Sequence, residues 1–197
     1  MNTRSRFLSG FPLIRSACIV LLLVSAASFG FAQDGNLFPN GEFDSPNSAG
    51  DWPAKISKPN KGNHSWGNEG GERFIRMEST TPLETVLLYQ QISLRGAQEV
   101  EMTIRARVSG LVKGPKSWFD ARIMGDFRDS GSQKIKDFKP ITFGRDTDGW
   151  VERTVTMPVP DGAVFMAIMP SLLQVNAGTL DIASITVTPV VETAPQL

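Results

Sequence analysis

Short apolar segments that alternate with polar residues dominate this sequence and restrict the folds it can adopt. They are rich in Val, Ile, Thr and Phe, and turn-forming residues separate them: the 197-residue chain has 18 glycines and 13 prolines. Because a period of two places successive side chains on opposite faces, this pattern predicts half-buried β-strands. We find no convincing helix of three turns outside the N-terminal region, so we expect an all-β fold.

The spacing of these segments is typical of a β-sandwich or a barrel. The segment 44–72 is rich in Gly, Asn and Pro and is predicted to be a long loop, and the tail 189–197 is expected to be frayed and flexible. Residues 33–188 are expected to form one domain. The predicted strands are 73–79, 85–94, 99–109, 117–127, 134–143, 150–158, 163–174 and 179–188, with two short edge pieces near 36–43 and 54–57.

The N-terminus has the pattern of an export signal. Residues 1–17 carry three arginines and no acidic residue, and an apolar core of about 16 residues follows, ending in Gly30-Phe31-Ala32. This small-x-small ending predicts cleavage after residue 32, so 1–32 is the predicted signal peptide. The apolar core is shorter than the roughly 20 residues of a spanning helix. We expect a secreted or periplasmic protein that is not inserted in the membrane after cleavage.

Removal of this signal changes both the cysteine content and the charge. Cys18 is the only cysteine, so residues 33–197 contain none and cannot form a disulfide. The signal holds three of the 20 basic residues and none of the 20 acidic ones, which leaves a net charge of −3. A mildly acidic chain of this kind argues against a nucleic-acid partner.

Two segments place a dense set of polar side chains on one face of a strand. Met102, Ile104, Ala106 and Val108 alternate with charged or polar residues, and a second alternation follows over 118–127. Sugar binding needs a flat aromatic ring for stacking and planar groups that pair with hydroxyls, which arginine and carboxylates supply. A solvated face with weak ion pairs is the other interpretation. We expect the two strands to be neighbours, so that their polar residues form one binding surface. The candidate binding residues are Arg105, Arg107, Trp118, Asp120 and Arg122.

The remaining aromatic residues leave alternatives open. Tyr89, the only tyrosine, either extends the binding face or is buried with its hydroxyl bonded. Trp66, in the loop-like segment, either caps one end of a binding cleft or folds back on the domain. Trp52 and Trp150 are predicted to pack inside the fold.

Several motifs, in their order along the chain, resemble carbohydrate-binding modules of families 4, 9 and 22. These modules share a galactose-binding-like jelly-roll β-sandwich, and their ligand lies across one concave sheet. The resemblance implies a polysaccharide or glycan ligand and covers nearly all of 36–188. The matching segments are Asn36 to Phe43, Phe74 to Met77, Tyr89 to Leu94, Met102 to Arg107, Gly149-Trp150, Val159 to Ala163 and Gly178 to Ile182.

The same resemblance implies a structural calcium ion between the N-terminal loop and the last strand. Glu42 and Asp181 match these regions, and calcium needs six to eight oxygen ligands. The family commonly has paired aspartates before the final V-x-V motif of the last strand, where this chain has Ala183-Ser184 before Ile185-Thr186-Val187. One expected carboxylate is therefore absent.

Catalytic patterns are scarce. His64 is the only histidine, which excludes histidine-based triads and multi-histidine metal centres. Carboxylates are present, but no spacing singles out a pair for glycoside hydrolysis. We therefore predict a non-catalytic protein that binds a polysaccharide or glycan, with a separate envelope protein or glycoside-active enzyme as a further partner. The alternative is an envelope structural or adhesion protein whose jelly roll binds another protein.

Overall fold

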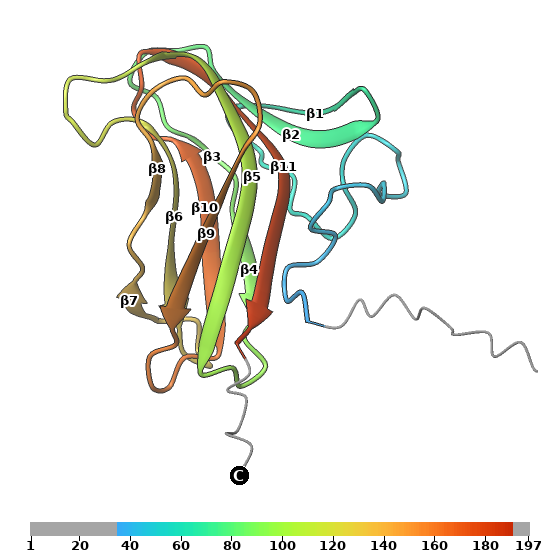
Figure 1. Cartoon of the computed structure of the whole chain (residues 1–197), viewed down its shortest axis with the longest axis vertical. Helices are drawn as coiled ribbons and strands as arrows, with labels where there is room; N and C mark the ends of the chain where they lie inside the picture. The colour runs from blue at the N-terminus through green and yellow to red at the C-terminus, as the bar shows by residue number, and fades with distance from the viewer. Residues whose placement is uncertain (1–34, 191–197) are drawn as a thin grey trace, which may run out of the picture. The chain divides into compact units, whose positions relative to one another are not determined.

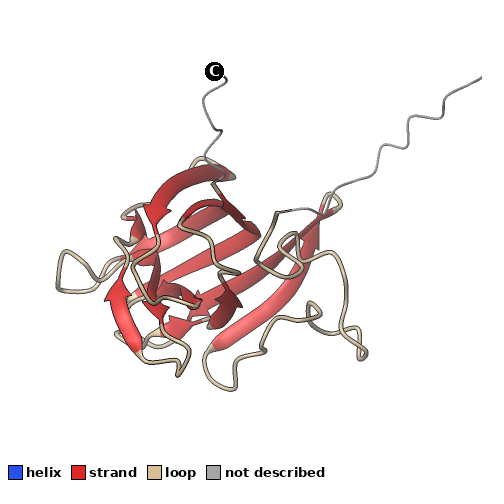
Figure 2. Cartoon of the chain, turned by 90° about the horizontal axis from the view of Figure 1, so that it is seen from below, coloured by secondary structure: helices blue, strands red, loops and turns tan. Residues whose placement is uncertain are grey.

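The computed structural model describes residues 35–190 and contains two packed antiparallel sheets (Figure 1). The predicted signal peptide and residues 191–197 of the predicted tail lie outside the described residues. Within 35–190 the chain forms strands and loops but no helix (Figure 2). None of these residues therefore belongs to a helix long and apolar enough to cross a membrane. The prediction of an all-β sandwich is confirmed.

Eleven strands make up the two sheets. One sheet has five strands in the order β1-β2-β11-β5-β9. The other has six: β3 and β4 pair with one side of β10, β6 with its other side, and β7 and β8 with the far side of β6. The strands are β1 Asn63–Glu69, β2 Glu72–Ser79, β3 Val86–Leu87, β4 Gln90–Ser93, β5 Glu99–Val112, β6 Ala121–Arg128, β7 Lys134–Asp137, β8 Ile141–Phe143, β9 Val151–Pro158, β10 Phe165–Leu172 and β11 Ala177–Pro189.

An apolar core fills the space between the sheets. In Figure 1 the layer of β9, β5 and β11 lies in front of β6 and β10. Met102, Ile104, Ala106 and Val108 of β5 are fully buried, as their alternation predicts. The inward residues of the facing sheet, such as Ile123 of β6, belong to the same core. The sandwich is therefore stabilised mainly by buried apolar surface.

Two predicted strands are each divided in the structure. The segment 85–94 forms β3 and β4 because Pro170 of the facing β10 has no N–H to donate to the ladder, although Leu88 N still donates to its carbonyl oxygen at 3.0 Å. The segment 134–143 forms β7 and β8, and the intervening Phe138 is buried in the core.

The N-terminal segment differs most from the prediction. Strand β1 lies inside the segment 44–72 that was expected to be a loop, because its polar residues and Gly67 hide the strand pattern. Residues 36–43 and 54–57 are not strands. The first of these still follows β11, since Leu37 N donates to Val187 O at 2.7 Å and Ile185 N donates to Gly41 O at 2.9 Å. At the other end, Pro189 belongs to β11 rather than to a tail.

Gly125 allows β6 and β10 to lie against Phe138. A Cβ atom at this position would overlap both the Ala167 carbonyl oxygen and the Phe138 ring. We predict that Gly125→Ala lowers the free energy of unfolding by about 2 kcal/mol, because overpacking forces backbone or ring to move. Urea unfolding measures this change. Gly131→Ala, in an exposed turn without backbone crowding, is the matched control, and an equal effect of both substitutions would contradict the prediction.

Candidate functional site

The predicted binding surface is divided between the two sheets. Arg105 and Arg107 lie on β5, which pairs with β9 and β11. Asp120 and Arg122 lie at the start of β6, which pairs with β10, β7 and β8. The prediction that these residues form one surface is therefore wrong, because β5 and β6 follow each other in the chain but belong to opposite layers.

On the outer face of the five-stranded sheet, Arg105 and Arg107 are held by carboxylates. The Asp181 carboxylate is almost completely buried and accepts hydrogen bonds from Arg76 Nε at 2.7 Å and from Arg107 Nη2 at 2.8 Å. Arg107 also donates to Glu69 at 2.8 Å. Hydrogen bonds to Glu69 and then to Asp181 raise the pKa of Arg107. This arrangement ties β1, β2, β5 and β11 together.

Arg105 belongs to the same polar cluster. Its Nε donates to Glu72 Oε1 at 2.7 Å, and this bond raises the pKa of the guanidinium group. The Trp150 ring lies 5.6 Å from the Arg105 guanidinium and 5.7 Å from the Phe74 ring. Nε and Nη2 of Arg105 are both bound to Glu72, while 38% of the Arg105 side chain stays exposed. The cluster is thus an ion-pair network on the outer face of the five-stranded sheet.

The outer face of the six-stranded sheet carries a different set of side chains. Along β10 the outward residues include Ala167, Met169 and Ser171, and the small Ala167 and Ser171 are fully buried by their taller neighbours. Ala167 lies opposite Gln91 of β4 on one side and Asp126 of β6 on the other. Small buried residues therefore alternate along β10 with the larger, partly buried Phe165 and Met169, and rows of side chains from β4 and β6 lie on either side.

Two arginine–aspartate pairs stand in one of these rows. Arg122 Nε donates to Asp120 Oδ1 at 2.6 Å, and Arg128 makes a two-point contact with Asp126. Asp120, Arg122 and Asp126 are buried, while Arg128 is partly exposed. The alternation that predicts Asp120 and Arg122 continues to Asp126 and Arg128. Asp126 lies within the alternating segment 118–127 but was not selected, and Arg128 lies one residue beyond its end.

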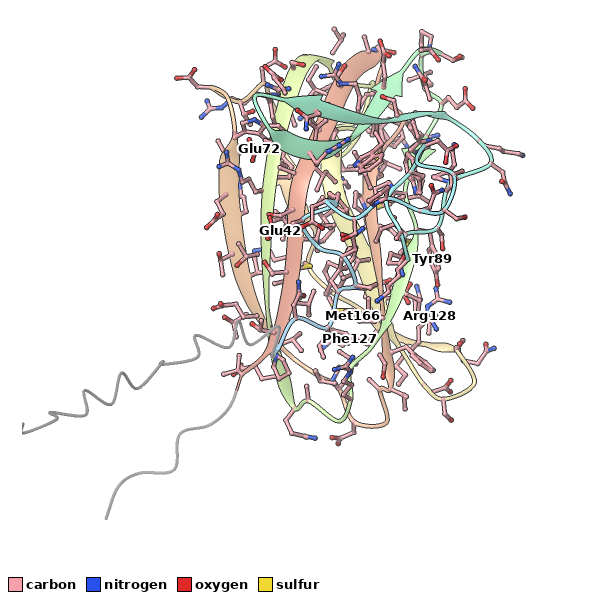
Figure 3. The ribbon with its side chains drawn as sticks, turned by 90° about the vertical axis from the view of Figure 1, so that its right-hand side faces the viewer. Glu42, Glu72, Tyr89, Phe127, Arg128 and Met166 are labelled. Atoms are coloured by element: carbon pink, nitrogen blue, oxygen red, sulfur yellow. The ribbon has the colours of Figure 1, made fainter. Side chains whose placement is uncertain are left out.

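Tyr89 stands in the opposite row. It lies between β3 and β4, and 38% of its surface is exposed. Its hydroxyl donates to Gln91 Oε1 at 3.2 Å, and the Arg128 guanidinium lies 5.8 Å from its ring. In Figure 3, Tyr89 and Arg128 lie toward one margin of the molecule and Glu42 and Glu72 toward the other, with Phe127 and Met166 between them. Tyr89 is thus an exposed ring on the outer face of the six-stranded sheet.

The two tryptophans predicted as binding residues lie on other segments of the chain than Tyr89. Trp118 occupies the turn before β6, outside any strand, and 52% of its surface is exposed. Trp66 lies in β1, donates its indole N–H to Phe43 O at 3.1 Å and packs against the core. Because β1 belongs to the opposite sheet, Trp66 folds back on the domain and does not cap a cleft over β6.

Comparison with solved structures identifies the fold. The enzymatically active domain of bacteriophage CBA120 tailspike protein 4 matches 79% of this chain with a TM-score of 0.57 and 13% identity. A second structure is described as the structural basis for the promiscuous specificity of carbohydrate-binding modules from the β-sandwich superfamily. It matches 75% of this chain with a TM-score of 0.50 and 15% identity. The chain has the jelly-roll fold of carbohydrate-binding modules.

These matches extend over unequal parts of the other proteins. The match with this chain covers only 21% of the tailspike chain and 60% of the second chain. A family 4 carbohydrate-binding module is similar along 77% of this chain and 98% of its own, with 18% identity and a TM-score of 0.49. No family model matches the sequence. No curated protein matches it either.

Asp181, one of the two predicted calcium ligands, is bound to arginines in the structure. Asp181 uses both carboxylate oxygens for Arg76 and Arg107, so a metal ion would have to displace these guanidinium groups. Glu42 lines a cavity of about 470 Å³ beside Asn40 and Asp44. Within residues 35–190, no group of three or more His, Cys, Asp or Glu side chains is placed to hold a metal. Calcium binding stays a prediction, and Asp181 does not fit it.

Asp181 is instead predicted to stabilise the jelly roll. Asp181→Asn removes the charge that two guanidinium groups share, and we expect a loss of about 2 kcal/mol in the free energy of unfolding. Chemical denaturation measures it. Glu69→Gln, which alters a mostly exposed partner of the same Arg107, should cost less than about 0.5 kcal/mol. Equal losses for the two variants would contradict a central role of Asp181.

His64 gives the jelly roll a pH-dependent stability. Both ring nitrogens are buried, and burial lowers the pKa of His64 from its ordinary value of 6.5. The fold therefore favours the neutral ring, and this contribution is present above pH 6.5 and lost as the pH falls toward the lowered pKa. Between pH 8 and pH 5, the free energy of unfolding should fall more for the wild type than for His64→Gln. Parallel pH profiles would refute the prediction.

Proposed function

We propose that this protein is a non-catalytic carbohydrate-binding module that binds a glycan chain along the outer face of its six-stranded sheet. The observation that carries the proposal is the exposed Tyr89 ring opposite a row of fixed arginine–aspartate pairs. An aromatic ring offers a flat surface to the C–H face of a sugar, and its neighbours offer donors and acceptors to the hydroxyls.

The polar groups around Tyr89 are held in place before any ligand binds. Asp126 fixes Arg128, and Gln91 contacts both the Tyr89 hydroxyl and Ser132 Oγ, the latter at 3.5 Å. Side chains that are already ordered lose less conformational entropy on binding, which favours affinity. Of the charged groups in this row only Arg128 is partly exposed, so the contacts open to a glycan centre on Tyr89, Gln91 and Arg128.

The charge distribution on this surface favours an uncharged glycan over an acidic one as the ligand. Each arginine of the row already has the aspartate two residues before it as its partner. An acidic polymer would have to compete with two buried carboxylates for these guanidinium groups. The arginine content alone is therefore no reason to expect an acidic ligand on the sheet face.

The predicted export signal indicates where the protein would act. A protein released from the cytoplasm would meet polysaccharides in the periplasm or outside the cell, and a separate glycoside-active enzyme is a suitable partner. The fold is also compatible with an envelope adhesion role, because one fold carries many functions.

We predict that Tyr89→Ala weakens glycan binding at least tenfold, about 1.4 kcal/mol, because it removes the stacking surface. Affinity electrophoresis against a broad set of polysaccharides identifies the best neutral ligand, and isothermal titration measures the loss. Tyr89→Phe should retain most of the affinity, since the ring remains.

Arg105→Ala serves as the control, because Arg105 lies on the opposite sheet and should leave glycan binding unchanged. If Arg105→Ala abolishes binding and Tyr89→Ala does not, the site lies on the five-stranded sheet. If no polysaccharide retards the wild-type protein, the carbohydrate proposal fails and the adhesion alternative gains support. Release of reducing ends or unsaturated products would contradict the non-catalytic part.

A further inference from the structure

A rigid aromatic turn extends the sheet face at one end of β6. The turn 113–119 projects at the upper left of Figure 1, between β5 and β6. It is closed by hydrogen bonds from Gly114 N to Phe119 O at 3.1 Å and from Phe119 N to Lys116 O at 2.9 Å. A Cβ atom on Gly114 would overlap the Gln174 carbonyl oxygen, so this turn is tightly seated on the neighbouring segment.

The same segment fixes both ends of the turn. Asn176 Nδ2 donates to Lys113 O at 2.9 Å, and Leu173 N donates to Asp120 O at 2.9 Å. Trp118 is the exposed tip of this anchored turn, and its ring packs edge-to-face on Phe119 with the centroids 6.0 Å apart. A half-exposed tryptophan held this firmly is typical of a binding surface rather than of a mobile loop.

The charges of the turn differ from those of the sheet face. The Lys116 ammonium lies 5.2 Å from the centre of the Trp118 ring, and Lys113 is exposed nearby in the chain. Within residues 35–190, neither lysine takes part in an ion pair. Of the carboxylates near the turn, Asp120 is bound by Arg122, and Asp146 accepts from Gly110 N and Leu111 N.

We propose that Trp118, Lys116 and Lys113 form an end subsite that binds an anionic sugar, one that carries a carboxylate or sulfate group. This inference rests on the proposed glycan-binding function and deepens it. The exposed part of the Trp118 ring stacks on the sugar, and the Lys116 ammonium beside the ring meets the negative charge. Lys113, whose ammonium lies toward Gly144, adds a second positive charge from the same turn. Trp118 precedes Asp120 by two residues, at most about 7 Å of chain, so one glycan can contact the sheet face and this subsite together.

This arrangement assigns the two kinds of cation different roles. The arginines of the sheet face are neutralised by their aspartates and order the hydroxyl-binding groups. The lysines of the turn keep their charge free for the ligand. A glycan with neutral repeating units and an acidic residue or substituent at one point fits both parts.

The experiment compares one polymer in two charge states. The best neutral polysaccharide from the screen described above is carboxymethylated at low substitution, and both forms are titrated against the wild type at low and high salt. The carboxymethylated form should bind about two- to fivefold tighter at low salt, the gain expected from an exposed ion pair, and high salt should remove the gain. Lys113→Ala/Lys116→Ala should abolish this preference and leave the affinity for the neutral form unchanged.

The matched control is Lys61→Ala/Lys136→Ala, which removes the same charge from exposed lysines away from the turn. Lys136 pairs with the inward Phe127 on an edge strand, so it does not face the glycan surface. The control should keep the preference for the carboxymethylated form.

Three outcomes would overturn the inference. The first is equal affinity of the wild type for both polymers, and the second is a preference that survives loss of Lys113 and Lys116. In both cases binding of the neutral polymer through Tyr89 would stand. The third is that the protein binds vesicles containing anionic phospholipid and that Trp118→Ala abolishes this binding while leaving glycan binding unchanged. That result would assign the turn to a membrane surface. Failure of the proposed function is distinct, because it shows as no binding of any polysaccharide.

Discussion

The apolar contact between two sheets is the constraint on which the rest of this structure depends. Within residues 35–190 there is no cysteine to cross-link the layers, and the inward residues of β5, β11, β6 and β10 are fully buried between them. Each strand must therefore give one face to the core. Only the outward positions are left for recognition, and each outward face belongs to one sheet. The candidate site is therefore composed of side chains on or beside β4, β6 and β10 of the six-stranded sheet, and polar residues of β5 cannot join it.

The sequence predicted the faces of the strands well and the neighbours of the strands poorly. Alternation is local, so the burial of Met102 to Val108 and the outward position of Arg105 could be predicted residue by residue. Which strands pair is decided by contacts far apart in the chain, and the pattern does not encode them locally. The assumption that β5 and β6 are neighbours was therefore the weak step, and it joined Arg105 to Arg122 on a surface that does not exist.

The candidate site was predicted in part for the same reason. Asp120, Arg122 and Tyr89 were identified, since their residue types and alternation are visible in the sequence. Asp126 and Arg128 follow the same alternation and could have been found by extending it. The burial of the small residues Ala167 and Ser171 could not be predicted, because it depends on which side chains the strand pairing places beside them.

Pro170 has a consequence beyond the division of one strand into β3 and β4. It places Tyr89 in a short interval without regular strand pairing, flanked on both sides by residues that are paired to β10. A side chain in such an interval can be exchanged during evolution without disturbing a ladder, whereas its backbone position stays bounded by the two adjacent strands. The proline thus separates the part of the sheet that preserves the architecture from the position at which related proteins could acquire a new ligand preference.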